Sequence, residues 1–439
     1  MFAPGGVFAH SGVKQFHRAA TVCLMLAAMG VVMGIVTPGQ ADTDLGVVGT
    51  GVHLPVVISI GILYVLALSP LLMEPKKMLR GYRSVAWFAP LILFCLVSAA
   101  WSASPSLTLR RGFFLALTTL TGLVLGTKYS LSELARMLAL ASVLHFALVL
   151  VFFVVDPRQI FSLSDGHALK GLTTHKNIFG FEAGLAVLVF LLVPFRRMAM
   201  LRWPLAATAF LLLVLSRSAG SLVSTLVALA FLPFLWLLRF RGLQRIPLLL
   251  LSFTTMAVAV WFLVQNLALV PQVLSKDPTL TGRTELWTLV VQAIGQRPML
   301  GYGFDSFWMG LQGESLGIIR DVGWLVPTAH NGYLDLLLGT GIVGVLLFLP
   351  LLLQSLRRAI QTADTLTGSE RYFPAAFLLF LLVYNLNESA LITRSGIPFL
   401  LFVSINVATT RARNARQATS LKALYPATTF GLGASSLAR

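Results

Sequence analysis

The chain alternates long apolar runs with short polar segments along nearly its whole length. A helical span needs about 20 apolar residues, and in lipid only helices and closed barrels satisfy every backbone polar group. The pattern therefore predicts an all-α fold, a polytopic helical membrane protein with about 12 transmembrane helices. The expected spans are residues 19–36, 53–73, 84–100, 113–127, 134–155, 178–195, 203–216, 219–238, 246–265, 332–353, 373–391 and 396–410.

The first run, residues 19–36, also has the apolar character of a cleaved signal peptide. One run among about twelve similar ones is more simply another span, and cleavage would leave the topology that follows unchanged.

Lysine and arginine gather in alternate loops, and membrane proteins retain these residues on the cytoplasmic side. We therefore expect both termini in the cytoplasm and the loop of residues 267–331 in the periplasm. Residues 1–410, this loop included, form a single membrane domain. Residues 411–439 form a basic cytoplasmic tail that we expect to be disordered.

Composition agrees with this class, since 57% of the residues are hydrophobic and only 11% are charged. The net charge of +17 lies mostly in short loops, where topology and anionic lipid explain it, so membrane lipids and not nucleic acid are the expected partner. Both cysteines, Cys23 and Cys95, lie in apolar spans without paired spacing, which indicates neither a disulfide framework nor a metal site.

The loop of residues 267–331 is much longer than a connection between two helices requires, and such loops are usually functional or disordered. After Gly282-Arg283, apolar residues recur at three- and four-residue intervals, which predicts an amphipathic helix on the membrane surface. These apolar positions are Leu286, Leu289, Val290, Ala293 and Ile294. The run Pro298-Met299-Leu300-Gly301-Tyr302-Gly303 then predicts a tight turn close to another backbone.

Several cations adjoin the outer ends of spans, where the positive-inside rule disfavours them. They are Arg110, Arg111, Lys170, His175, Lys176, Arg217 and Arg283. A polyanion held at the outer interface, such as a lipid-linked pyrophosphate, would explain them, and arginine forks suit phosphate oxygens best. The alternative is that each side chain snorkels to lipid headgroups, and this alternative is weakest for Arg217 and Arg283.

His330 stands just ahead of the helix expected from residue 332. The positive end of a helix dipole favours the neutral imidazole, which can act as a general base. The alternative is a helix cap or an interface histidine. Two carboxylates in expected spans, Glu182 and Glu388, are costly there, so each either orients an outer arginine or makes a structural hydrogen bond.

His330-Asn331, nine further residues, Gly341 and Gly344 give the spacing H-N-x9-G-x-x-G. This spacing resembles the signature of the superfamily of O-antigen ligases and Wzy-type polysaccharide polymerases. Gly282-Arg283, a following Trp and the Pro-x-x-Gly-x-Gly turn resemble its loop pattern. Weaker similarities lie at Trp101-Ser102 and Ser216-Arg217-Ser218. The run from Gly171 to His175-Lys176-Asn177 looks most like the exopolysaccharide polymerase branch.

The resemblance implies an inner-membrane enzyme of bacteria that transfers a glycan from an undecaprenyl-pyrophosphate carrier to a sugar hydroxyl on the periplasmic face. His330 would be the base, and Arg217 and Arg283 would hold the pyrophosphate. The further substrate-binding candidates are Arg110, Arg111, Lys176, Glu285, Trp287, Asn331 and Glu388. A chain-length regulator and a flippase would be its protein partners, and no cofactor is expected. No metal-ligand spacing and no Asp-x-Asp run lies among the motif residues between Gly282 and Gly344, which favours a metal-independent mechanism.

Three functions stay open at this point. A polymerase that joins lipid-linked repeat units of an exopolysaccharide is preferred. An O-antigen ligase differs from it only in the acceptor, which would be lipid A core. A polysaccharide transporter or flippase also explains the spans and the buried carboxylates, but it leaves the loop of residues 267–331 unexplained.

Overall fold

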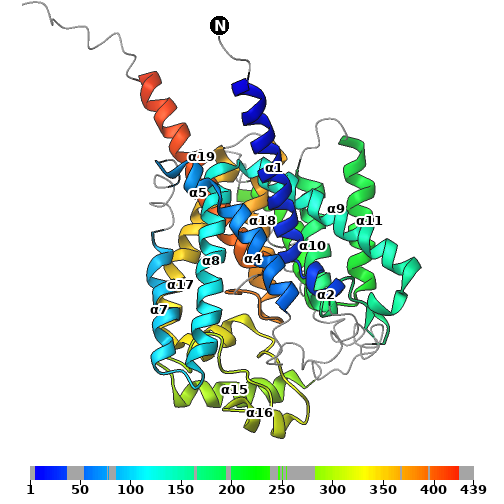
Figure 1. Ribbon diagram of the computed structural model, residues 1–439, viewed down its shortest axis with the longest axis vertical. Helices are drawn as coiled ribbons and strands as arrows, with labels where there is room; N and C mark the ends of the chain where they lie inside the picture. Colours follow the sequence, from blue (N-terminus) through cyan, green and yellow to red (C-terminus); the bar gives the residue numbers. More distant parts are fainter. Residues whose placement is uncertain are drawn as a thin grey trace, which may run out of the picture.

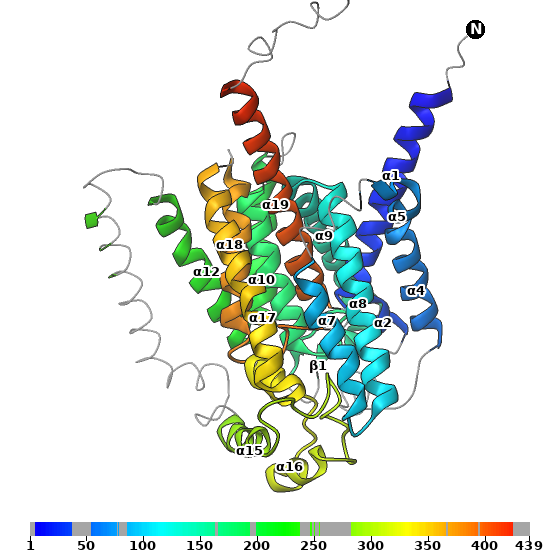
Figure 2. The same ribbon diagram turned by 90° about the vertical axis from the view of Figure 1, so that its left-hand side faces the viewer.

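The computed structural model describes residues 5–36, 54–76, 78, 86–162, 166–193, 199–237, 246, 247, 250, 254, 282–365, 368–393 and 396–424. Long helices stand side by side in one bundle, and the short helices α15 and α16 lie at one end of it (Figures 1 and 2). We call this end the loop end. The first residues of α1 and the last residues of α19 lie at the opposite end in both views.

The first part of the bundle is built from the helices α1 Gly5–Ala28, α2 Val31–Val36, α4 Leu54–Leu68, α5 Pro70–Met73, α7 Phe88–Val97, α8 Pro105–Lys128, α9 Leu131–Val155 and α10 Lys176–Leu192. The second part contains α11 Arg202–Leu215, α12 Ala219–Leu237, α15 Arg283–Gln296, α16 Ser315–Val322, α17 Gly332–Thr365, α18 Phe373–Tyr384 and α19 Ile397–Leu424. A small antiparallel pair, β1 Phe161–Ser162 and β2 Ala168–Leu169, precedes α10, with Phe161 opposite Leu169.

The helical membrane fold expected from the apolar pattern is confirmed. Within the described residues, five helical stretches are long and apolar enough to cross a membrane, namely Val56–Met73, Pro105–Lys128, Leu131–Val155, Ala219–Leu237 and Gly332–Ala363. Large apolar side chains point outward from them, such as Val65 and Val154, which are 70% and 78% exposed. Such exposure suits a surface covered by lipid. The count of about twelve spans stays a prediction, and most of the expected span 246–265 lies outside the described residues.

Three expectations were wrong in part. The first run is two helices, since the chain breaks at Gly30, which has a φ of 83°. The span expected at 373–391 ends at Tyr384 because the polar residues after it turn back toward α17. The tail expected to be disordered from residue 411 continues α19 as far as Leu424, since its Arg, Ala, Gln and Lys residues are strong helix formers. Residues 425–439 lie outside the described part.

The loop end has an apolar core of its own, beneath α15 and α16. The amphipathic helix expected after Gly282 is confirmed as α15, with Leu286 and Val290 fully buried. The buried members of this loop-end core are Leu286, Val290, Tyr302, Phe307, Trp308, Ile318, Ile319, Val326, Ala329 and Leu338. Because Ala329 and Leu338 belong to it, the core fixes the start of α17 to the loop.

The glycine turn of residues 298–303 docks into a break in α17. At the break Gly341 has φ 62° and ψ −166°, a conformation that only glycine adopts readily. The backbone N–H of Ile342 donates to the Pro298 carbonyl at 2.8 Å, and that of Tyr302 donates to the Leu338 carbonyl at 2.9 Å. The expected close approach of this turn to another backbone is therefore confirmed.

The segment between α7 and α8 holds the same turn from its other side. Ser102 Oγ donates to Ser306 Oγ at 2.9 Å, and Trp101 Nε1 donates to the Leu300 carbonyl at 3.3 Å. The Trp101-Ser102 pair singled out in the sequence thus contacts the glycine turn.

Gly341→Ala is expected to destabilise the protein by about 2 kcal/mol or more, because the conformation is strained for alanine and a Cβ would lie 2.3 Å from the Met299 carbonyl oxygen. The measurement is the Tm of the purified protein in nanodiscs. Gly295→Ala is the matched control, since Gly295 is exposed on α15 and nothing lies within 4 Å of its Cβ position. An unchanged Tm for Gly341→Ala would contradict the docking described above.

Candidate functional site

The site is organised around Glu388, which lies in the turn of residues 385–393 after α18. This turn is fixed to the first residue of α17, because the N–H of Gly332 donates to the carbonyls of Asn385 at 2.9 Å and Glu388 at 3.0 Å. The Asn385 side chain accepts from the N–H of Ala390 at 2.8 Å. Glu388 is therefore held close to residues 330 and 331.

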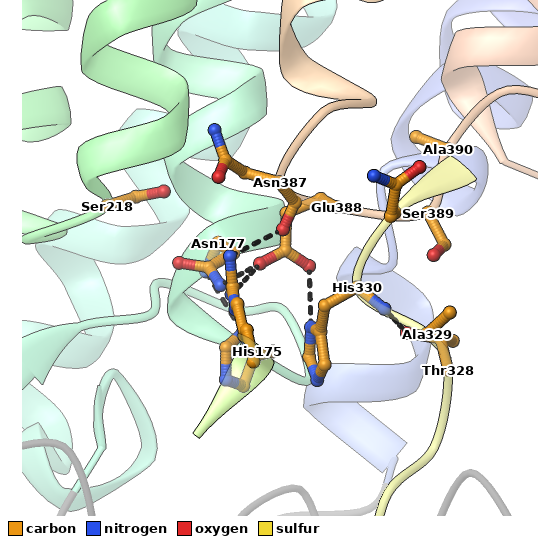
Figure 3. Close-up of polar contacts among 12 residues, drawn as sticks. His175, Asn177, Ser218, Thr328, Ala329, His330, Asn387, Glu388, Ser389 and Ala390 are labelled. Carbon is orange, nitrogen blue, oxygen red and sulfur yellow. Dashed lines mark hydrogen bonds and ion pairs between the residues drawn. The ribbon is translucent and has the colours of Figure 1, made fainter. Parts of the chain in front are cut away.

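Three side chains from three other segments contact the Glu388 carboxylate. Figure 3 shows Asn177 and His330 beside it. Arg283 Nη2 donates to Oε1 at 2.7 Å, and Asn177 Nδ2 donates to the same oxygen. His330 Nδ1 lies 3.2 Å from Oε2. The predicted pairing of Glu388 with an outer arginine is confirmed. The structure also brings Arg283 and His330 to the same carboxylate, which the sequence did not predict.

The Glu388 carboxylate is mostly sheltered, with 13% of its side chain exposed. Burial alone raises its pKa, but the charge and hydrogen bond of His330 and the charges of Arg283 and His175 outweigh burial and lower the pKa to about 2. The group is therefore an anion at any physiological pH.

His330 has a left-handed backbone conformation, with a φ of 47°. Its N–H donates to Thr328 Oγ1 at 3.2 Å. The residue before it, Ala329, is held at both its N–H and its carbonyl. The N–H donates to the Asp335 carboxylate at 3.1 Å, and the carbonyl accepts from Trp287 Nε1 at 2.9 Å. Such strained conformations cluster at functional sites, where the surroundings must enforce them.

Asp335 links several segments around His330 and was not among the candidate residues of the sequence. Besides the Ala329 N–H it accepts from Trp308 Nε1 at 2.7 Å and from Ser389 Oγ. One carboxylate thus joins the loop-end core, the residue before His330 and the residue after Glu388. Its place in the first turn of α17, five residues after His330, was the available signal.

Arg283 begins α15, directly after Gly282, which has a φ of 77°. Its guanidinium donates twice to the turn after α18, through Nη1 to the Asn387 carbonyl at 2.7 Å and through Nη2 to Glu388. These two hydrogen bonds keep the Arg283 guanidinium close to His330.

Arg217 lies near the same turn but points elsewhere. It has a φ of 50°, and its Nη1 donates to the Gly166 carbonyl at 2.8 Å. The start of α12 does reach the site, since a Cβ on Gly220 would lie 3.3 Å from Asn387 Cβ. Arg217 is thus at the loop end, with its exposed side chain turned toward the β1–β2 segment.

Of the other binding candidates, two support the site. Asn331 and Trp287 support the site, since Asn331 Oδ1 accepts from the N–H of Tyr333 at 3.0 Å and so caps α17, while Trp287 holds Ala329. Lys176 is buried in the first turn of α10 beside Asn177. Glu285 and Arg110 are exposed, and Arg111 lies 3.5 Å from the Asp305 carboxylate.

Glu182 was expected to pair with an outer arginine or to make a structural bond, and the arginine alternative was wrong. Its Oε2 lies 2.9 Å from Nδ1 of His145, a partner on α9, and both side chains are almost fully buried. The hydrogen bond from Asn177 to Glu388 was not predicted. The His175-Lys176-Asn177 run was the feature of the sequence that could have pointed to Asn177.

The arrangement defines the chemistry of the imidazole. A carboxylate accepts but does not donate, so the His330 Nδ1 that faces Glu388 carries a proton. In the neutral ring Nε2 is then the proton acceptor. The site therefore offers one oriented base next to an arginine, a combination suited to deprotonating a hydroxyl near an anionic group.

Comparison with known proteins agrees with this geometry. Residues 204–349 match the family model described as O-Antigen ligase, and this stretch contains Arg217, Arg283 and His330. The chain is 27% identical over 304 residues to the exopolysaccharide production protein ExoQ of Rhizobium meliloti (strain 1021). That similarity covers 66% of this chain and 68% of the relative. The chain is therefore similar to the O-antigen ligase family over residues 204–349 and to an exopolysaccharide production protein over 66% of its length.

Proposed function

We propose that the protein is a metal-independent glycosyltransferase that polymerises undecaprenyl-pyrophosphate-linked repeat units of an exopolysaccharide. The observation that carries the proposal is the contact of Glu388 with both His330 and Arg283 at the loop end. The exopolysaccharide relative favours the polymerase over the ligase.

In the proposed reaction His330 Nε2 takes the proton of the acceptor hydroxyl as its oxygen attacks the anomeric carbon of the donor. The bond between that carbon and the phosphate oxygen breaks, and the pyrophosphate leaves with the electron pair. Arg283 stabilises this anion, and arginine does so without losing its own charge. Glu388 holds the imidazole in the required tautomer.

We place the loop end in the periplasm and both termini in the cytoplasm. Supporting this, Arg411, Arg413 and Arg416 belong to the second half of α19, and α19 ends on the side of the bundle opposite the loop end (Figure 2). The inner membrane of a bacterium is the matching location, with a flippase to supply the lipid-linked repeat and a chain-length regulator as further partners.

An O-antigen ligase is the second candidate, because the matched family model carries that description. The glycan profile of a deletion strain separates the two functions. A polymerase defect leaves single lipid-linked repeats, whereas a ligase defect leaves long lipid-linked polymer that is not attached to lipid A core. Single repeats that disappear on complementation support the polymerase, and accumulated polymer overturns it in favour of the ligase.

Arg283→Lys is expected to lower the rate of polymerisation about tenfold or more, because one ammonium cannot reproduce the guanidinium fork toward Asn387 and Glu388. Initial rates with lipid-linked repeats measure this. Arg297→Lys at the other end of α15 is the matched control, since Arg297 is 44% exposed and pairs with Glu314. Equal rates for both variants would show that the fork at Arg283 has no part in the reaction.

A further inference from the structure

Trp324 lies close to His330 and to Gly282, the residue before Arg283. It is not one of the side chains described above as contacting the Glu388 carboxylate. It is partly buried in the segment between α16 and α17. Its ring centroid lies 5.9 Å from that of His330, with 38° between the ring planes. A Cβ on Gly282, the residue before Arg283, would lie 3.7 Å from Trp324 Nε1. The indole therefore lies next to His330 and to the start of α15.

The indole N–H distinguishes Trp324 from the other tryptophans described at this end. Trp101 donates to the Leu300 carbonyl, Trp287 to the Ala329 carbonyl and Trp308 to the Asp335 carboxylate. Among the described residues, no hydrogen-bond acceptor contacts the N–H of Trp324, and its nitrogen is not among the buried polar atoms that lack a partner. It can thus serve a ligand, and a tryptophan combines that polar group with a broad apolar face.

The reaction places a sugar at this position. The attacking hydroxyl must lie about 2.6 to 3.2 Å from the base. Glu388, paired with Arg283, occupies the Nδ1 side of the imidazole, so the sugar ring that bears the hydroxyl must extend over another neighbouring surface. The face of a pyranose that carries C–H groups is apolar, while its hydroxyls accept hydrogen bonds, which matches an indole face with an available N–H.

We propose that Trp324 is the platform for the acceptor sugar, stacking on the C–H face of a pyranose and donating its N–H to a ring hydroxyl. This inference rests on the function proposed above and identifies the acceptor subsite of the same reaction. The ligand class is a pyranose with one largely apolar face, presented at the end of a repeat unit. Trp324 is then a positioning and specificity residue, and His330 remains the base.

The test uses the full chain in nanodiscs, with the lipid-pyrophosphate-linked repeat as donor and the free repeat-unit oligosaccharide as acceptor. For Trp324→Ala we expect the KM for this acceptor to rise about tenfold, with kcat changed less than about threefold. Trp324→Phe keeps a flat apolar face but loses the N–H, so its KM should rise only about threefold. Val322→Ala removes packing from the same loop-end core and should leave KM unchanged.

An unchanged KM for Trp324→Ala overturns the platform, and so does an equal rise for Val322→Ala, which would reduce Trp324 to a packing residue. The wild-type chain and His330→Asn, run beside them, isolate the proposed function. If the wild type transfers sugar and His330→Asn does not, a negative result for Trp324 concerns the platform alone. If the wild type transfers nothing to this acceptor, the function itself fails, and the platform with it.

Discussion

His330→Asn is expected to lower the rate of sugar transfer by about 10²- to 10⁴-fold, the usual contribution of a general base. Asparagine tolerates the left-handed conformation that His330 adopts, and its amide reaches the position of Nδ1, so the contact with Glu388 survives while the basic Nε2 is lost. The measurement is the initial rate of repeat-unit coupling, together with the amount of protein in the membrane. His330→Ala should be equally inactive.

Added imidazole should restore part of the activity of His330→Ala, because it supplies a base to the space left by the side chain. It should do nothing for the wild type. Near-normal rates for His330→Asn with normal membrane levels would exclude His330 as the base.

Glu388→Gln is expected to lower the rate by about 10²-fold or more, since a neutral amide no longer fixes the imidazole tautomer by charge and leaves Arg283 without its anion. Glu388 touches the base and not the reacting atoms, so a readout beyond rate is needed. With the carboxylate gone, the imidazolium loses stabilisation, and the acidic limb of the rate profile should move to lower pH.

Glu388 itself does not shape that limb. Its pKa is lowered to about 2, so its stabilising charge is fully present above its ordinary pKa and is lost only as the pH falls toward about 2. Between pH 5 and pH 8 the Glu388 carboxylate therefore stays ionised. Glu388→Asp keeps the charge and should retain the position of the limb. If the limb of Glu388→Gln stays in place while the rate falls, Glu388 acts only on the fold.

Local patterns predicted much of the loop end. The three- and four-residue spacing of apolar residues after Gly282 located α15, and the polar-to-apolar change at His330 located the start of α17. Each of these two signals is local to a single helix, α15 or α17, and local patterns of this kind are read directly from the sequence. The glycine turn was also foreseen, although nothing in the sequence identified the break at Gly341 as its docking place.

Long-range partners could not be read in this way. Hydropathy continues through Leu386, Ala390 and Leu391, so it did not reveal that α18 stops at Tyr384 and frees Glu388 to turn toward α17. Pairings such as Glu182 with His145, or Asn177 with Glu388, depend on which helices become neighbours. Arg217 was found by its position at a helix end, but that position does not determine where its guanidinium points.

The most direct test of the central claim is reconstitution of the purified chain in nanodiscs with lipid-pyrophosphate-linked single repeats, in the presence of a chelator. We expect lipid-linked dimers and longer oligomers, one lipid pyrophosphate released for each bond formed, and neither product with His330→Asn. If single repeats persist while added lipid A core is glycosylated, or if His330→Asn forms oligomers at the wild-type rate, the account is contradicted.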